Sequence, residues 1–153
     1  MAALDTLVNP PFANDPPVKL NLDAKVVGLV VAILAGIGGL LSLFGLLGLL
    51  GLGAALTVFG GIFALALIGI AVNLVADVMM VMGGWQMYQG NESGKRLVIY
   101  GLALAFLAQI VLALGYTAGS AILQLILLAI VYYVVVVSRF PGEAPSAGSS
   151  RSM

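Results

Sequence analysis

Residues 26–88 form one long apolar stretch in which Asp77 is the only acidic or basic side chain. As a single helix this stretch would measure ~95 Å, about three times the ~30 Å thickness of a bilayer's hydrocarbon core. No proline occurs between Val18 and Phe140, so nothing there prevents long helices. The stretch must therefore fold back on itself, and it predicts more than one membrane-spanning helix.

Composition supports this interpretation. The chain is 62% hydrophobic and 8% charged, whereas an ordinary soluble domain is about 45–50% apolar and about 25% charged. So few charged side chains cannot cover the surface of a soluble protein of this size. We therefore expect an all-α, polytopic integral membrane protein.

Glycine density indicates where the chain reverses. Glycine accepts turn conformations most easily, and glycines cluster at 48–53, where we predict the first reversal. The second apolar run, 97–138, would be ~63 Å long as one helix, so we expect it to split near residues 115–119. The result is four transmembrane helices arranged as two hairpins. The predicted spans are residues 26–48, 54–84, 97–114 and 119–138.

The distribution of basic residues predicts the orientation. With four spans, the N-terminal arm, the 89–96 loop and the C-terminal tail lie on one side, and these segments contain every Lys and Arg. Basic residues mark the cytoplasmic side, so both termini are expected in the cytoplasm, with the protein in the inner (cytoplasmic) membrane. Three spans in the first run would divide the cations between both sides. The predicted interfacial anchors are Lys95, Arg96, Arg139 and Trp85.

Two segments flank the predicted transmembrane domain, residues 26–138. Residues 1–25 contain four of the six prolines, which favours an extended cytoplasmic arm lying on the membrane or on a partner; a disordered tail is the alternative. Residues 139–153 are rich in Pro, Gly and Ser and predict a flexible cytoplasmic tail. In the loop between the hairpins, Ser93 is the expected N-cap of the third span.

Small residues recur at helical spacing on the first three predicted spans. Such stripes allow helix backbones to approach closely in a membrane, where the hydrophobic effect contributes little to association between helices. The predicted helix-packing seam contains Gly28, Ala32, Ala35, Gly39, Gly69, Gly101, Ala105 and Ala108. Ser42 continues the stripe of the first span. The fourth span is apolar almost all round and is expected to face lipid or an apolar partner.

One polar cluster is predicted inside the membrane. An Asp at the centre of a membrane helix costs about 2.5–3.5 kcal/mol, so Asp77 requires a hydrogen-bonding partner or a function. Asn73 lies one turn away on the same face. Counted from the cytoplasmic boundary, Asp77, Asn73, Gln109 and Gln124 fall at similar depths of ~16–22 Å. We expect these four residues, from three helices, to meet near the middle of the membrane.

The sequence carries no catalytic signature. The absence of His and Cys excludes the usual zinc, iron–sulfur and most haem sites, so no metal or cofactor is expected. A formal net charge of zero argues against nucleic-acid binding. The favoured function is a non-enzymatic accessory, scaffold or assembly subunit of a larger membrane complex, or a homo-oligomer, with membrane lipids and other subunits or itself as partners. The alternative is a minor transporter or channel component that handles protons or cations through Asp77.

Overall fold

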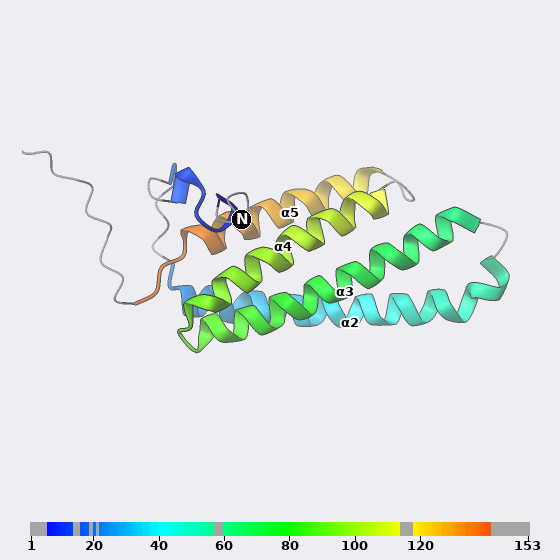
Figure 1. The fold of residues 1–153 in the computed structure, drawn as a ribbon, viewed down its shortest axis with the longest axis horizontal. Helices are drawn as coiled ribbons and strands as arrows, with labels where there is room; N and C mark the ends of the chain where they lie inside the picture. Colours follow the sequence, from blue (N-terminus) through cyan, green and yellow to red (C-terminus); the bar gives the residue numbers. More distant parts are fainter. Residues whose placement is uncertain are drawn as a thin grey trace, which may run out of the picture.

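A computed structural model describes residues 6–13, 16–18, 20, 22–56, 60–113 and 118–141. In these residues the chain is helical, with no strand and one isolated bridge between residues 23 and 139. The elements are a short 3₁₀ helix, η1 (Pro11–Ala13), and four long helices: α2 (Ala24–Leu56), α3 (Gly60–Tyr88), α4 (Glu92–Ala113) and α5 (Ala118–Val137) (Figure 1).

Three helices are long and apolar enough to cross a membrane. By length and composition these segments are Ala24–Gly51 of α2, Phe63–Tyr88 of α3 and Glu92–Ala113 of α4. In α5 the corresponding apolar stretch, Ile122–Val137, is shorter, although only described residues enter this comparison. The all-helical class expected from the apolar runs is therefore confirmed, with three described helices that could span a membrane.

The first reversal lies further along the chain than predicted. Helix α2 continues through the glycines at 48–53 and ends at Leu56, and α3 begins at Gly60, so the turn predicted at 48–53 is wrong. In an apolar environment each backbone N–H and C=O needs an internal partner, and remaining helical supplies it even where glycine is frequent. The second predicted reversal, 115–119, lies mostly outside the described residues.

The helices pack in chain order. Helix α3 packs along both α2 and α4, whereas α5 packs on α4 and meets α2 over a shorter stretch. The α2–α3 hairpin extends well beyond the α4–α5 hairpin at one end of the bundle (Figure 1). We call this extension the distal hairpin; it comprises the second half of α2 and the first half of α3.

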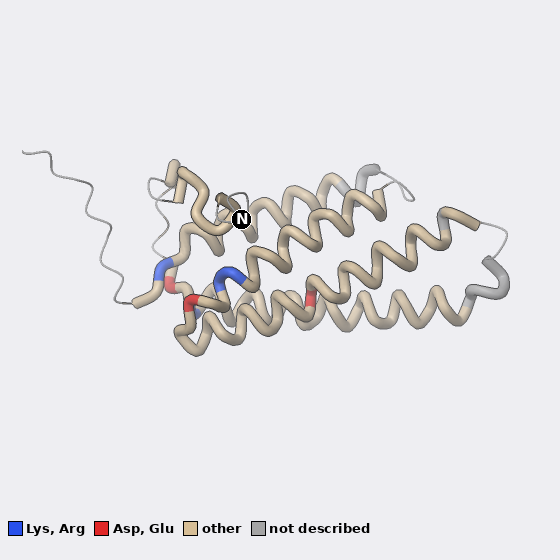
Figure 2. The backbone as a smooth tube through the Cα atoms, viewed as in Figure 1, with Lys and Arg blue, Asp and Glu red and all other residues tan. Residues whose placement is uncertain are grey.

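The opposite end carries the charge. In the described part of the chain every acidic or basic residue except Asp77 lies there (Figure 2). We call it the charged end, and its members are Asp23, Lys25, Glu92, Lys95, Arg96 and Arg139. The buried core lies in the same half of the bundle, where Met87, Ile99 and Val135 are among the largest side chains that are fully buried.

The turn between α3 and α4 has a defined geometry. Gly90 has a φ of 85°, in the left-handed region that favours glycine. The N–H of Gly90 donates to Met87 O and that of Asn91 to Gln86 O, each over 2.9 Å, which is the Schellman pattern for ending a helix. The Asn91 Oδ1 accepts from the Ser93 N–H at 3.0 Å. Asn91 is therefore the N-cap of α4, and the assignment of that role to Ser93 is wrong.

The N-terminal arm docks on the chain itself. The Tyr132 hydroxyl donates to Leu7 O at 2.7 Å. The Tyr133 hydroxyl donates to Val18 O at 3.0 Å and accepts from the Val18 N–H at 3.2 Å. The ring of Phe12 stacks on that of Tyr133, with centroids 6.0 Å apart. The described part of the arm thus lies against the last turns of α5.

Backbone hydrogen bonds join the start of α2 to the end of α5. The Ala24 N–H donates to Arg139 O at 2.8 Å, and the Arg139 N–H donates to Leu22 O at 3.1 Å. Asp23 caps α2, because its Oδ1 accepts from the Lys25 N–H at 2.8 Å. Residues just before the first helix and just after the last one are therefore neighbours at the charged end.

Candidate functional site

Asp77 lies on α3 and is buried, with 6% of its surface exposed. Two consecutive glycines of α2 bring that backbone close to it. A methyl group placed on Gly38 would lie 3.4 Å from Asp77 Oδ1, and one placed on Gly39 would lie 3.3 Å from Asp77 Cβ. The glycines therefore let the backbone of α2 pass directly beside the carboxyl group.

Three side chains from two helices form a closed set of hydrogen bonds. The Ser42 hydroxyl, on α2, donates to Asp77 Oδ2 at 3.1 Å. The Asn73 amide, one turn before Asp77, donates to Ser42 Oγ at 3.0 Å and to Asp77 Oδ2 at 3.1 Å. One carboxyl oxygen thus accepts two hydrogen bonds. No buried side-chain nitrogen or oxygen in the described residues lacks a partner.

Ser42 is the member of this set that sequence analysis did not identify as a polar partner. Its place on a stripe of small residues indicated packing alone. Its distance from the charged end could have identified it as a partner, because Ser42 lies 17 residues after Lys25, or ~26 Å along a helix. That depth is close to the ~22 Å estimated for Asn73. Depth matching applied to hydroxyl side chains would have included Ser42.

The four residues predicted to meet at mid-membrane line one cavity. Asn73 and Asp77 on α3, Gln109 on α4 and Gln124 on α5 all border a space of about 220 Å³. Gln109 is half-buried and Gln124 is exposed. In the described part of the chain neither glutamine hydrogen-bonds to Asp77, which accepts hydrogen bonds from Ser42 and Asn73. Polar side chains from three helices therefore line the cavity. The hydrogen bonds of Ser42 with Asp77 and Asn73 join α2 to α3.

The predicted packing seam lies at contacts between helices. A methyl group on Gly28 would lie 2.5 Å from Met87 Cβ, and one on Gly101 would lie 2.7 Å from Met80 Cγ. These distances require glycine, because real Cβ atoms do not approach other heavy atoms so closely. Ala32 borders Gly84, and Gly69 meets Leu112. Ala35, Ala105 and Ala108 are buried.

The four predicted interfacial anchors lie at the charged end in different settings. Lys95 is occupied by α5: its Nζ donates to Val136 O at 2.8 Å and to Ser138 O at 3.0 Å. It thus satisfies carbonyl groups at the C-terminus of α5, a role favoured for cations by the helix dipole. Arg96 and Arg139 are exposed. Trp85 is exposed beside Tyr88, with ring centroids 5.6 Å apart.

The chemistry that this site can perform is limited to what one carboxyl, one hydroxyl and a few amides provide. No group of three or more His, Cys, Asp or Glu side chains that could hold a metal ion occurs among the residues described. A single acidic group in a hydrogen-bonded setting can hold helices in register or exchange a proton.

Comparisons with protein families, with curated proteins and with solved structures find no match to this chain.

Proposed function

We propose that this chain is a non-enzymatic membrane protein that acts by packing, as an accessory, scaffold or assembly subunit of a larger complex or as a homo-oligomer. In this proposal α2, α3, α4 and α5 all cross the inner (cytoplasmic) membrane, and the charged end faces the cytoplasm, as the concentration of basic residues favours. The observation that carries the proposal is the distal hairpin, which is too long for a bilayer and has little cover from the rest of the chain.

The α2–α3 hairpin is longer than a bilayer's hydrocarbon core is thick. At ~1.5 Å per residue, α4 and α5, with 22 and 20 residues, measure about 33 Å and 30 Å and match a hydrocarbon core of ~30 Å. Helices α2 and α3, with 33 and 29 residues, measure about 50 Å and 44 Å. Even a tilt of about 40° accommodates only ~39 Å. Part of this apolar hairpin therefore needs cover beyond the lipid core.

The second half of α2 is exposed in the described structure. Leu41 and Phe44 on the second half of α2 are each 67% exposed. Methyl groups placed on Gly45, Gly48 or Gly51 would meet nothing within 4 Å in the described structure. In the first half of the same helix, Gly28 closely contacts α3. The distal glycines therefore lie on a helix face that is free to pack against a helix of another subunit or copy.

Site-specific crosslinking tests this proposal, and the absence of cysteine simplifies it. A Gly48→Cys variant carrying a thiol-linked photocrosslinker is illuminated in native membranes. Leu50→Cys is the control, because Leu50 lies at the same depth, is also exposed and points to another side of α2. We expect a discrete protein adduct from Gly48→Cys and only lipid adducts from Leu50→Cys. The proposal would be refuted if Gly48→Cys and Leu50→Cys were labelled equally, neither gave a discrete protein adduct, and the protein purified as a monomer in mild detergent.

A second experiment tests the number of passes and the orientation. Ala2→Cys and Ser152→Cys variants are treated with a membrane-impermeant maleimide in intact cells and in lysed cells. Four spans with cytoplasmic termini predict that both thiols react only after lysis. A terminus that reacts from outside intact cells would contradict this topology.

The cavity beside Asp77 supports a second candidate function, that of a minor transporter or channel component handling protons or cations. It brings Asp77 together with amide side chains from two further helices, and intramembrane acidic residues often serve ion pathways. In reconstituted vesicles, Asp77→Asn is expected to abolish proton or cation flux if this function is correct, whereas Asp23→Asn at the charged end preserves it. For the packing function, both variants remain near wild type in complex formation.

A further inference from the structure

The cavity that Asp77 shares with the amide side chains is polar at one end and apolar at the other. Gln109 on α4 and Gln124 on α5 border the part nearer the distal hairpin. Met80 and Val131 border the part nearer the charged end. Asp77 lies between these two groups. We call this space the Asp77 cavity; its hydrogen-bonding side chains lie at the level of Asp77 and on its distal side.

The polar side chains of the Asp77 cavity lie at successive depths below the end of the α4–α5 hairpin. Gly69 on α3 is level with the end of α4, because a methyl group placed on it would lie 2.6 Å from Leu112 Cδ2. Asp77 is eight residues further along α3, or ~12 Å deeper. Gln109 precedes the end of α4 by four residues, or ~6 Å, and Gln124 follows the start of α5 by six residues, or ~9 Å. The amides therefore lie between that end of the hairpin and the carboxyl group.

The two glutamine side chains need hydrogen-bonding partners that the described chain does not supply. Among the residues that the structure describes, neither amide makes a hydrogen bond. An amide without partners in an apolar environment costs about 1–3 kcal/mol. Buried water typically makes about three hydrogen bonds to polar groups of the protein. A space of about 220 Å³ bordered by one carboxyl group and three amides has room and partners for several water molecules.

Towards the charged end, α3 and α4 are in direct contact. Met80 and Leu102 are buried, and a methyl group placed on Gly101 would lie 2.7 Å from Met80 Cγ. Nearer the charged end, a methyl group placed on Gly83 would lie 2.7 Å from the backbone nitrogen of Val98. The apolar core therefore separates α3 and α4 from water on that side of the carboxyl group.

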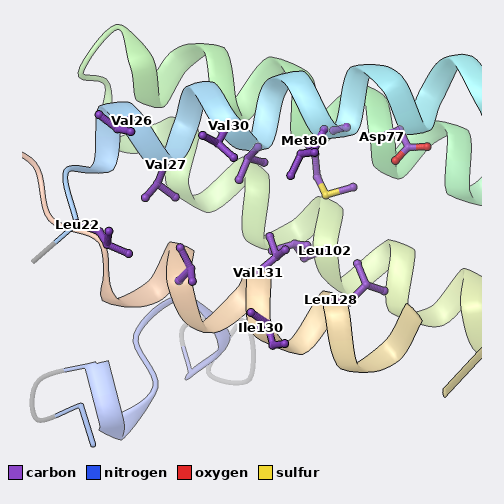
Figure 3. Close-up of a pocket in the computed structure, with 14 residues that line it drawn as sticks. Leu22, Val26, Val27, Val30, Asp77, Met80, Leu102, Leu128, Ile130 and Val131 are labelled. Atoms are coloured by element: carbon purple, nitrogen blue, oxygen red, sulfur yellow. The ribbon is translucent and has the colours of Figure 1, made fainter. Parts of the chain in front are cut away.

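A second space reaches Asp77 from the charged end, between α2 and α5. It is a groove of about 480 Å³, and Figure 3 shows Asp77 at the opposite end from Leu22. All of its other lining residues are Val, Leu, Ile, Ala or Met. The groove thus offers water no hydrogen-bonding side chain before Asp77 is reached. A polar path leads to Asp77 through the Asp77 cavity and not through this groove.

We propose that the Asp77 cavity is a water-filled site that admits small monovalent cations to Asp77 from the distal side, the side of the membrane nearest the distal hairpin. A single positive charge fits, because every other acidic or basic side chain in the described residues lies at the charged end (Figure 2). A divalent ion beside one carboxylate would leave a net charge in an apolar environment, which is costly. The inference rests on the four-span topology and deepens the second candidate function, but it concerns access to Asp77 and does not require flux.

Substituted cysteines test this access, because the chain has no cysteine of its own. Membrane vesicles containing the full chain are treated with Ag⁺, a small monovalent cation that binds thiolates. The remaining free thiols are then labelled with a maleimide after unfolding. Gln124→Cys places the thiol in the cavity, and Leu123→Cys is the control, because Leu123 is exposed at the next position but does not line the cavity. We expect Gln124→Cys to react at least about tenfold faster, since a thiol forms its thiolate in water and not in hydrocarbon.

A second pair of variants tests whether the ion reaches the level of Asp77. Ala105 and Ala108 lie on α4 with 2% of their surface exposed, and only Ala105 lines the cavity. Ala108 is nearer the distal end of α4. We expect Ala105→Cys to react faster than Ala108→Cys although it lies deeper, an order that depth alone cannot produce. Circular dichroism checks that each variant remains helical.

The side of access is measured against a marker at the charged end. Arg96 is exposed there, so in sealed vesicles Arg96→Cys should react with Ag⁺ from the side opposite to that for Gln124→Cys. Equal rates within either cysteine pair, or reaction of Gln124→Cys from the same side as Arg96→Cys, would overturn the inference. If the thiols react as expected but reconstituted vesicles show no cation flux, the transport function is wrong and the inference stands.

Discussion

Replacing Gly28 by alanine tests the closest helix contact in the bundle. The added methyl group would lie 2.5 Å from Met87 Cβ and 2.7 Å from the carbonyl oxygen of Gly84. The obstructing atoms include backbone, so side-chain rotation cannot relieve the clash. Since ordinary contacts begin near 3.4 Å, α2 and α3 must separate by about 0.9 Å at this level. A gap of that size forfeits a quarter to a half of each dispersion contact beside it.

The expected destabilisation is about 1–3 kcal/mol, the usual cost of overpacking a well-packed interior. Gly36→Ala is the matched control on the same helix, because its nearest heavy atom would be Val81 Cγ2 at 3.9 Å. That variant is expected to be neutral, or stabilised by up to about 1 kcal/mol through alanine's higher helix propensity. The two substitutions should therefore differ by about 1–4 kcal/mol, although each adds one methyl group to α2.

Equilibrium unfolding in mixed micelles of mild detergent and SDS measures this difference. Trp85, the only tryptophan, follows Gly84 on α3 and is next to the contact, so its fluorescence reports the separation of α2 from α3. Circular dichroism provides the second probe. Equal unfolding midpoints for the two variants would refute the close α2–α3 approach at Gly28.

Three further substitutions test other contacts. Lys95→Met is expected to destabilise the bundle by about 1.5–3 kcal/mol in the same unfolding assay, because two carbonyl groups of the α5 terminus lose a charged donor; Arg96→Met, with an exposed side chain, should unfold like the wild type. Tyr133→Phe removes both hydrogen bonds to Val18. If docking of the N-terminal arm loses ~1 kcal/mol, limited proteolysis should cleave the arm about fivefold faster than in the wild type. Tyr88→Phe is the control. Ser42→Ala should cost about 1 kcal/mol for its two hydrogen bonds at ~0.6 kcal/mol each; no loss of stability would mean that Asn73 alone supports Asp77.

Much of the fold could be predicted from the apolar runs and from the distribution of charge. The runs require helices that fold back, and a break between α3 and α4 occurs where expected. It is shorter than the predicted loop at 89–96, because α4 already begins at Glu92. The first reversal was misplaced because glycine is easily accommodated in a membrane helix as well as in a turn. Local sequence could not decide between these uses for the glycines at 48–53.

The candidate site was predictable where helical spacing decides the contact. Asn73 and Asp77 are one turn apart, and the structure joins them by a hydrogen bond. Ser42 required matching of depths between helices. The contact of Lys95 with the end of α5 could not be predicted, because it joins positions 41 and 43 residues apart through tertiary packing alone.

The backbone pairing of Arg139 with Leu22 and Ala24 has a consequence for biosynthesis. The ribosome delivers α2 first, yet its hydrogen-bonding partner emerges only after every later helix has been translated. The start of α2 therefore lacks this partner during synthesis, and the residues that follow α5 supply it once they have been translated. Truncation just before Arg139 should accordingly leave the Ala24 N–H and the Leu22 carbonyl without these partners, although each of the four helices can still form.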